Sequence, residues 1–266
     1  MGQSGKYFSA EGTLKPEKKG KVTGKVRPII EAAIQNAGTF ADASILFDWT
    51  EFQIPKGTSK LVSVIAIVRG TNGVAQGALP IDLIFARSIN CEAPPSLGTK
   101  RAAVTTFNWS NHIIGFHPIV AGDYSDADLI TLRMAKTNVD DMVLSPEPCS
   151  GTNVGYDTIY VAGIAKAIFD WRSTVEVKTT RDADDIEDGT TKKLEVTAKS
   201  ALVNFSIGDV LRDEDELVLG EIKSIEGADD LTFLDETVGT DISDIHTDGK
   251  KVYNIHPISL IFGFER

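Results

Sequence analysis

Residues 61–88, LVSVIAIVRGTNGVAQGALPIDLIFARS, constrain the fold more than any other stretch of this chain. Their two ends are short runs rich in β-branched residues, which favour a pleated and partly buried backbone. Glycines fill the loop between the two runs, at positions where a helix would be interrupted. The stretch therefore predicts two buried strands joined by a Gly-rich loop, and it carries no recognisable catalytic motif.

The preceding segment predicts a further strand. Ile45, Phe47 and Trp49 alternate with other residues, which is the period of a half-buried strand. Pro55 and Gly57 then mark a turn. We therefore expect residues 45–69 to form a β-hairpin.

The remaining patterns extend this prediction to an all-β chain. Residues 28–36 favour a short helix that begins at Pro28, with a strand as the alternative. Near the end of the chain, apolar side chains alternate through residues 257–265, which indicates a closing strand. We expect an antiparallel β-sandwich, jelly-roll-like, followed by a small β-barrel-like domain. The expected boundaries are an extended basic N-terminal arm at 1–40, the sandwich at 41–180, an acidic linker at 181–192 and the small domain at 193–266.

Charge is distributed unevenly along the chain. Residues 1–28 carry seven Lys or Arg against two Glu, a net charge of +5, whereas residues 182–248 carry a net charge of −15. The whole chain has a net charge of −11, which argues against a general nucleic-acid-binding protein. A basic arm can bind acidic surfaces, and the alternative is a solvated tail. The candidate partner-binding residues of the arm are Lys15, Lys18, Lys19, Lys21, Lys25 and Arg27.

The two cysteines, Cys91 and Cys149, lie far apart in Pro-containing segments. Two distant thiols do not define a disulfide framework, so we expect free thiols and a reducing place of assembly. The first residues lack the apolar core of a secretory signal. No apolar run reaches the length of a membrane helix, and we expect no membrane association.

The sequence does not indicate catalysis, and we expect a non-enzymatic protein with no cofactor and no metal. Nucleophile motifs, phosphate-binding loops and zinc signatures are absent. A calcium loop starting at Asp184 would place Gly189 and Glu195 correctly, but Ile186 occupies a ligand position. Solvated linker residues are the simpler interpretation. Three aromatic residues, Trp49, Trp109 and Trp171, favour core or interface positions, with a sugar-stacking platform as the alternative.

Several segments resemble one class of viral proteins. The segments LPIDLIFARS, APPSLGTKRAA and DTIYVAGIAKA, and the later GDVL, LGEIKSI and YNIHPISLIFGFE, resemble β-sandwich virion proteins of tailed bacteriophages, including those of marine and cyanobacterial hosts. The resemblance covers residues 45–178 and, separately, 195–266. It implies a structural component of the particle, such as a head decoration (cement) protein, and it identifies no functional residues. The basic arm is not part of the resemblance.

These observations together predict a capsid decoration protein that binds neighbouring subunits through its arm. The expected partners are the major capsid protein or other virion proteins, together with further copies of this chain in a homo-oligomer. We do not expect nucleic acid as a partner. The expected location is the virion, assembled in the host cytoplasm. The alternative is a neck or tail protein, or a receptor-binding tail protein with a carbohydrate-binding β-sandwich.

Overall fold

The computed structural model describes residues 21–125, 131–149, 155–177, 192–197, 204–226, 230–233 and 249–265. Within these ranges the regular elements are β-strands, apart from one short helix, α1 (Ala32–Asn36), and two 3-10 turns. The all-β prediction is thus confirmed. The helix lies inside the segment for which a helix was the favoured interpretation, but it begins four residues after Pro28.

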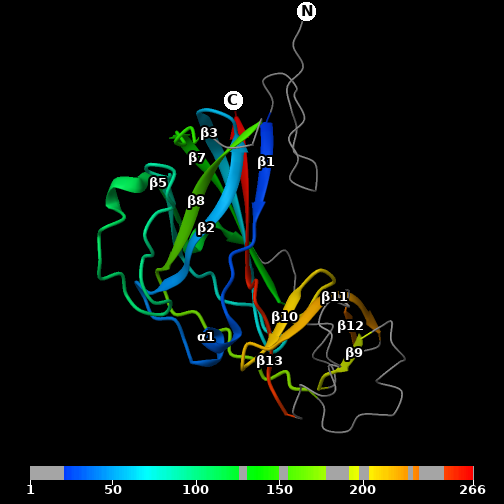
Figure 1. Ribbon diagram of the computed structural model, residues 1–266. Helices are drawn as coiled ribbons and strands as arrows, with labels where there is room; N and C mark the ends of the chain where they lie inside the picture. The colour runs from blue at the N-terminus through cyan, green and yellow to red at the C-terminus, as the bar shows by residue number, and fades with distance from the viewer. Residues whose placement is uncertain are drawn as a thin grey trace, which may run out of the picture.

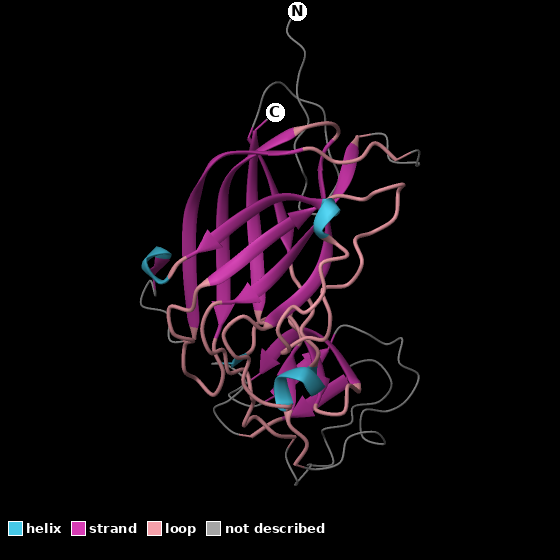
Figure 2. Ribbon diagram, turned by 90° about the vertical axis from the view of Figure 1, so that its left-hand side faces the viewer, coloured by secondary structure: helices cyan, strands magenta, loops and turns pink. Residues whose placement is uncertain are grey.

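Two antiparallel sheets form the larger unit (Figures 1 and 2). The first sheet has the order β1 (Lys21–Val26), β14 (Ile258–Glu265), β3 (Ser59–Arg69), β7 (Leu132–Leu144) and β6 (Tyr124–Ser125). The second has the order β2 (Ile45–Pro55), β8 (Tyr156–Ala165), β4 (Ile81–Ala86) and β5 (Ile113–Ile119). Both sheets contribute to one buried apolar cluster, which makes the unit sandwich-like.

Strand alternation explains this core. In β14 the side chains of Ile258, Leu260, Phe262 and Phe264 are buried. Phe52 of the other sheet reaches across to them, because its ring centroid lies 4.9 Å from that of Phe262. Each such aromatic side chain contributes about 1.5–3 kcal/mol when it is removed from water.

The expected hairpin over residues 45–69 is wrong. Strand β2 pairs with β8, whereas β3 pairs with β14 and β7, so the turn at Pro55–Ser59 carries the chain from one sheet to the other. Alternation shows which face of a strand is buried, but it does not show which strand lies along its edge. The strands β3 and β4, predicted around the Gly-rich loop, also lie in different sheets.

A separate five-stranded sheet forms the smaller unit, which lies below the sandwich in Figure 1. Its order is β13 (Val252–Asn254), β10 (Val210–Asp213), β11 (Val218–Glu226), β12 (Asp230–Phe233) and β9 (Lys192–Glu195), with antiparallel neighbours. It has its own core, which includes Val175, Leu211 and Ile222. Its outer strands β13 and β9 do not pair with each other in the described structure, but residues 176 and 177 bridge to both edges, Glu176 to Lys251 beside β13 and Val177 to Val196 beside β9. The described strands therefore form a barrel-like unit without a continuous closed sheet.

The two ends of the described chain meet in the sandwich. Strand β14 was expected to close the smaller unit, but it pairs with β1 and β3 of the larger one (Figure 1). The smaller unit is therefore inserted between β8 and β14. Residues 21–26, expected in an extended arm, form β1 and bury Val22 and Val26. Of the expected acidic linker 181–192, only Lys192 is described, and it begins β9.

The expectation of free thiols is also wrong. Cys91 and Cys149 form a disulfide, with their Cα atoms 5.5 Å apart. Cys91 follows β4 and Cys149 follows β7, which belong to opposite sheets, so the bond links the two layers of the sandwich. The separation of 58 residues concealed this proximity. Among the described residues, no helix is long and apolar enough to cross a membrane.

Candidate functional site

The six predicted arm residues have different positions. Lys15, Lys18 and Lys19 lie outside the described residues. Lys21 and Lys25 belong to β1, and the Lys25 side chain is exposed. Arg27 follows the strand and is half-buried. In the described part of the chain, these residues therefore do not form one continuous exposed patch.

Strand β1 lies at the edge of its sheet. It pairs with β14 on one side, and no described strand pairs with its other side. Val22 and Val26 hold it to the core, while Thr23 and Lys25 are exposed. An edge strand presents backbone N–H and C=O groups that a second chain can pair with. The basic N-terminal residues thus lead directly into a strand suited to interaction.

Arg27 is used inside the molecule. Its Nη2 lies 3.2 Å from Oδ1 of Asp209, and its Nη1 donates to the Gly208 carbonyl oxygen at 2.8 Å. Arg69, the last residue of β3, forms an ion pair with the other carboxylate oxygen of Asp209. The Ser206 N–H also donates to this carboxylate, at 2.8 Å. One carboxylate of the smaller unit therefore holds two arginines of the larger one.

Asp209 is almost completely buried, with 1% of its side chain exposed. Burial raises the pKa of its carboxyl group, and the positive charges of Arg69 and Arg27 oppose that shift. A buried carboxylate without such partners would be strongly destabilising. The paired arginines therefore make this inter-unit contact possible.

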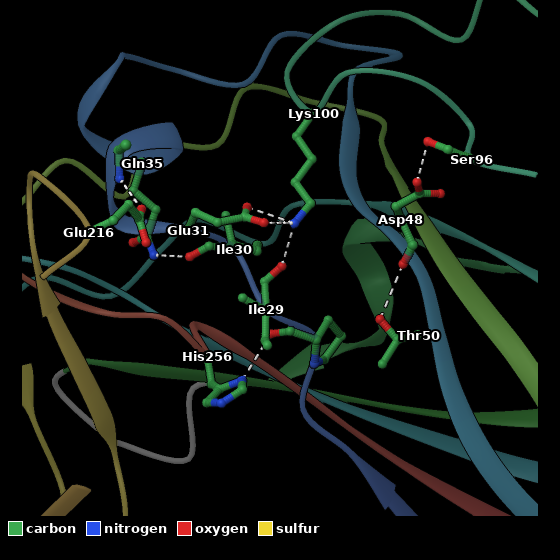
Figure 3. Close-up of polar contacts among 12 residues, drawn as sticks. Ile29, Ile30, Glu31, Gln35, Asp48, Thr50, Ser96, Lys100, Glu216 and His256 are labelled. Atoms are coloured by element: carbon green, nitrogen blue, oxygen red, sulfur yellow. Dashed lines mark hydrogen bonds and ion pairs between the residues drawn. The ribbon is translucent and has the colours of Figure 1, made fainter. Parts of the chain in front are cut away.

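Helix α1 is held by the smaller unit. Glu216, in the turn between β10 and β11, accepts a hydrogen bond from the Ala33 N–H at 2.6 Å (Figure 3). Next to it, Asn36 donates to Glu214 at 3.1 Å and accepts from the Tyr253 hydroxyl at 2.8 Å. The Gln35 amide nitrogen donates to the carbonyl oxygens of Ile30, at 2.7 Å, and Asn254, at 2.9 Å. The first turn of α1 is thus capped by a side chain from a different unit.

Residues 28–31, which precede α1, are held by contacts with Lys100 and His256 (Figure 3). Lys100, from the loop after β4, donates to the Ile29 carbonyl oxygen at 2.9 Å and pairs with the Glu31 carboxylate at 2.6 Å. His256 donates from Nδ1 to the Pro28 carbonyl oxygen at 3.1 Å. Burial lowers the pKa of His256, and the charge of Arg27 adds to that shift.

We call this region the junction, and it consists of residues 27–36 with Arg69, Lys100, Asp209, Glu214, Glu216 and 252–256. A cavity of about 30 Å³ adjoins it, lined by residues that include Gln35, Arg69, Trp171, Tyr253 and Asn254. The amide nitrogen of Asn254 is buried without a hydrogen-bond partner in the described structure. A space of this size holds about one water molecule and not a metabolite. The arrangement is therefore suited to fixing the two units together.

The three tryptophans lie in two separate places. Trp171 is buried against Phe40 and Phe169, and its Nε1 donates to the Arg69 carbonyl oxygen at 2.9 Å. Trp49 and Trp109 pack together elsewhere, with ring centroids 6.1 Å apart. The three rings therefore do not form one exposed platform, although the neighbouring Phe107 has 71% of its surface exposed.

Three of the four histidines lie among the described residues. His112 donates from Nδ1 to the Arg87 carbonyl oxygen, and His117 shares a hydrogen bond with Thr137. The third, His256, lies in the junction. The calcium-loop positions Asp184 and Gly189 lie outside the described residues.

Sequence reasoning missed two groups of residues. One is Asp209 with its arginines, for which the only signal was an Asp that follows Gly at the start of a strand. The other is a set of three potential metal ligands, Cys91, Glu147 and Cys149, which lie together among the described residues. The short spacing of Glu147 and Cys149 was visible, but their proximity to Cys91 depends on the fold.

Comparisons with protein-family models, with curated proteins and with solved structures give no match for this chain. The resemblance to phage virion proteins therefore rests on the sequence segments alone.

Proposed function

We propose that this chain is a non-enzymatic structural component of a bacteriophage particle, and specifically a capsid decoration protein that binds neighbouring subunits through its basic N-terminal arm. The observation that carries this proposal is the path of the chain at its N-terminal end. Basic residues lead into the edge strand β1, and β1 leads through Arg27 into the junction. The arm is thus joined through β1 to the larger unit and through Arg27 to the smaller unit.

The binding mode follows from the chemistry of the arm. Lysines attract an acidic surface over roughly 10 Å at moderate salt, and this attraction weakens as the salt concentration rises. Each arm supplies a modest contact, but many copies on one particle are retained through avidity. The docking role depends on the lysines, because the guanidinium group of Arg27 is already paired within the molecule.

The partners in this proposal are the major capsid protein or other virion proteins, together with further copies of this chain. The proposed location is the virion, after assembly in the host cytoplasm. A receptor-binding tail protein is the second candidate. The exposed ring of Phe107 beside Trp109 supports it, but the burial of Trp109 and Trp171 removes two of the three expected sugar-stacking residues.

Co-sedimentation with capsids that lack the protein tests the docking role. We expect the full chain to sediment with capsids, and we expect a variant with Lys15, Lys18 and Lys19 changed to Glu to remain in the supernatant. The matched control changes three exposed lysines elsewhere, Lys56, Lys136 and Lys223, to Glu. Equal loss of binding in both triple variants would show that overall charge, and not the arm, determines binding.

A further inference from the structure

Three side chains with metal-ligating atoms meet at one end of the sandwich. The sulfur atoms of Cys91 and Cys149 and a carboxylate oxygen of Glu147 all lie within 4.8 Å of one another. Both cysteines are exposed and Glu147 is half-buried, so solvent and ions reach the group. In the structure the two sulfur atoms are bonded to each other.

Glu147 is held in place by the chain that carries Cys91. Its two carboxylate oxygens accept hydrogen bonds from the N–H groups of Asn90, at 3.0 Å, and Cys91, at 2.9 Å. Hydrogen bonds of this kind orient the carboxylate ligands of metal sites. Among the described residues, no lysine or arginine forms an ion pair with Glu147. Its negative charge is therefore positioned and remains available to a cation.

The backbone conformation at Cys91 also supports a functional role for this residue. Ile89 and Glu92 exchange two backbone hydrogen bonds of 3.1 Å around a two-residue turn. Asn90 and Cys91 have φ angles of 56° and 62°, in the left-handed region. Glycine is the usual second residue of such a turn, and another residue there costs about 1 kcal/mol. The turn thus accepts strain at the position where it places the sulfur atom of Cys91 beside Glu147.

We propose that Cys91, Cys149 and Glu147 form a redox-gated binding site for a thiophilic divalent cation of the Zn²⁺ type. With the disulfide formed, the site is closed. With the disulfide reduced, two thiolates and one carboxylate supply three of the four ligands of a tetrahedral ion. Water, or a side chain from a bound partner, supplies the fourth. This inference does not depend on the proposed function.

The two steps balance with a thiol reductant. Two molecules of a thiol such as glutathione reduce the Cys91–Cys149 bond, giving two cysteine thiols and one glutathione disulfide. Binding of Zn²⁺ then releases two protons, one from each thiol, as two metal–sulfur bonds and one metal–oxygen bond form. Oxidation by a disulfide reverses the first step and releases the ion.

Metal titration of the full chain tests this site. The protein is reduced with a phosphine, freed of reductant under anaerobic conditions, and titrated with Zn²⁺ against a chromophoric chelator. We expect one Zn²⁺ per chain in the reduced protein and no comparable binding in the oxidised protein. Titration with Co²⁺ should give the absorption of a tetrahedral thiolate complex.

Variants identify the ligands. Cys91→Ser and Cys149→Ser should each abolish the one-to-one binding. Glu147→Gln should weaken it about tenfold or more, whereas the matched variant Glu92→Gln, an exposed neighbour in the same turn, should not. Near-UV circular dichroism of each variant checks that the fold is kept. Failure of the reduced wild type to bind Zn²⁺, or equal affinities of the two glutamate variants, would overturn the three-ligand site.

Discussion

Replacing Asp209 with alanine would remove the central contact of the junction. The carboxylate pairs with Arg27 and Arg69 and accepts the Ser206 N–H. Removing one partner of a buried ion pair costs roughly 3–5 kcal/mol. The two arginine side chains are 29% and 22% exposed, so water would solvate part of their charge. We therefore expect Asp209→Ala to lower the free energy of unfolding by about 3 kcal/mol.

Urea unfolding followed by tryptophan fluorescence measures this loss. Trp171 is a suitable reporter, because its Nε1 donates to the carbonyl oxygen of Arg69. The matched control is Asp215→Ala, since Asp215 pairs with Lys250 but has 65% of its side chain exposed. An exposed pair contributes about 0–1 kcal/mol. If Asp209→Ala cost less than about 1 kcal/mol, or no more than the control, our interpretation of the junction would be refuted.

Three further predictions concern other contacts. Glu216→Ala removes the acceptor of the Ala33 N–H and should cost about 1 kcal/mol, measured by urea unfolding. Phe52→Ala opens a cavity between the two sheets and should cost about 3–5 kcal/mol by the same measurement. Burial lowers the pKa of His117 and of His256, so the folded protein favours their neutral forms. The part of the free energy of unfolding that depends on neutral His117 and His256 is complete above pH about 6.5. It decreases as the pH falls below that value, because the unfolded chain then binds protons more readily than the folded one. Thermal unfolding at pH 7.5 and 5.5 should therefore show a smaller acid-induced loss for His256→Gln than for the wild type, and an equal loss would contradict this assignment.

Periodicity in the sequence predicted much of the local structure. The alternation of Ile258, Leu260, Phe262 and Phe264 correctly indicated a strand with one buried face. The same alternation fits either β unit, because it does not specify the strand alongside. That is why β14 was assigned to the smaller unit, and why β2 and β3 were paired as a hairpin. Pairing depends on contacts between residues that are far apart in sequence.

The candidate sites depended even more on long-range contacts. Asp209 lies in an acidic region and had the pattern of a solvated residue, yet it is buried between Arg27 and Arg69. These three residues come from three distant parts of the chain. Cys91 and Cys149 were expected to be separate thiols for the same reason. A local pattern identifies residue types suited to a site, but the fold alone brings them together.

The central claim is that this chain is a structural component of a phage particle. The most direct test is quantitative mass spectrometry of particles purified through a density gradient, compared with the soluble fraction of the same lysate. We predict that the chain remains with the particles in many copies, in constant ratio to the major capsid protein across the gradient peak. Recovery of the chain only in the soluble fraction, with none in intact particles, would contradict the proposal.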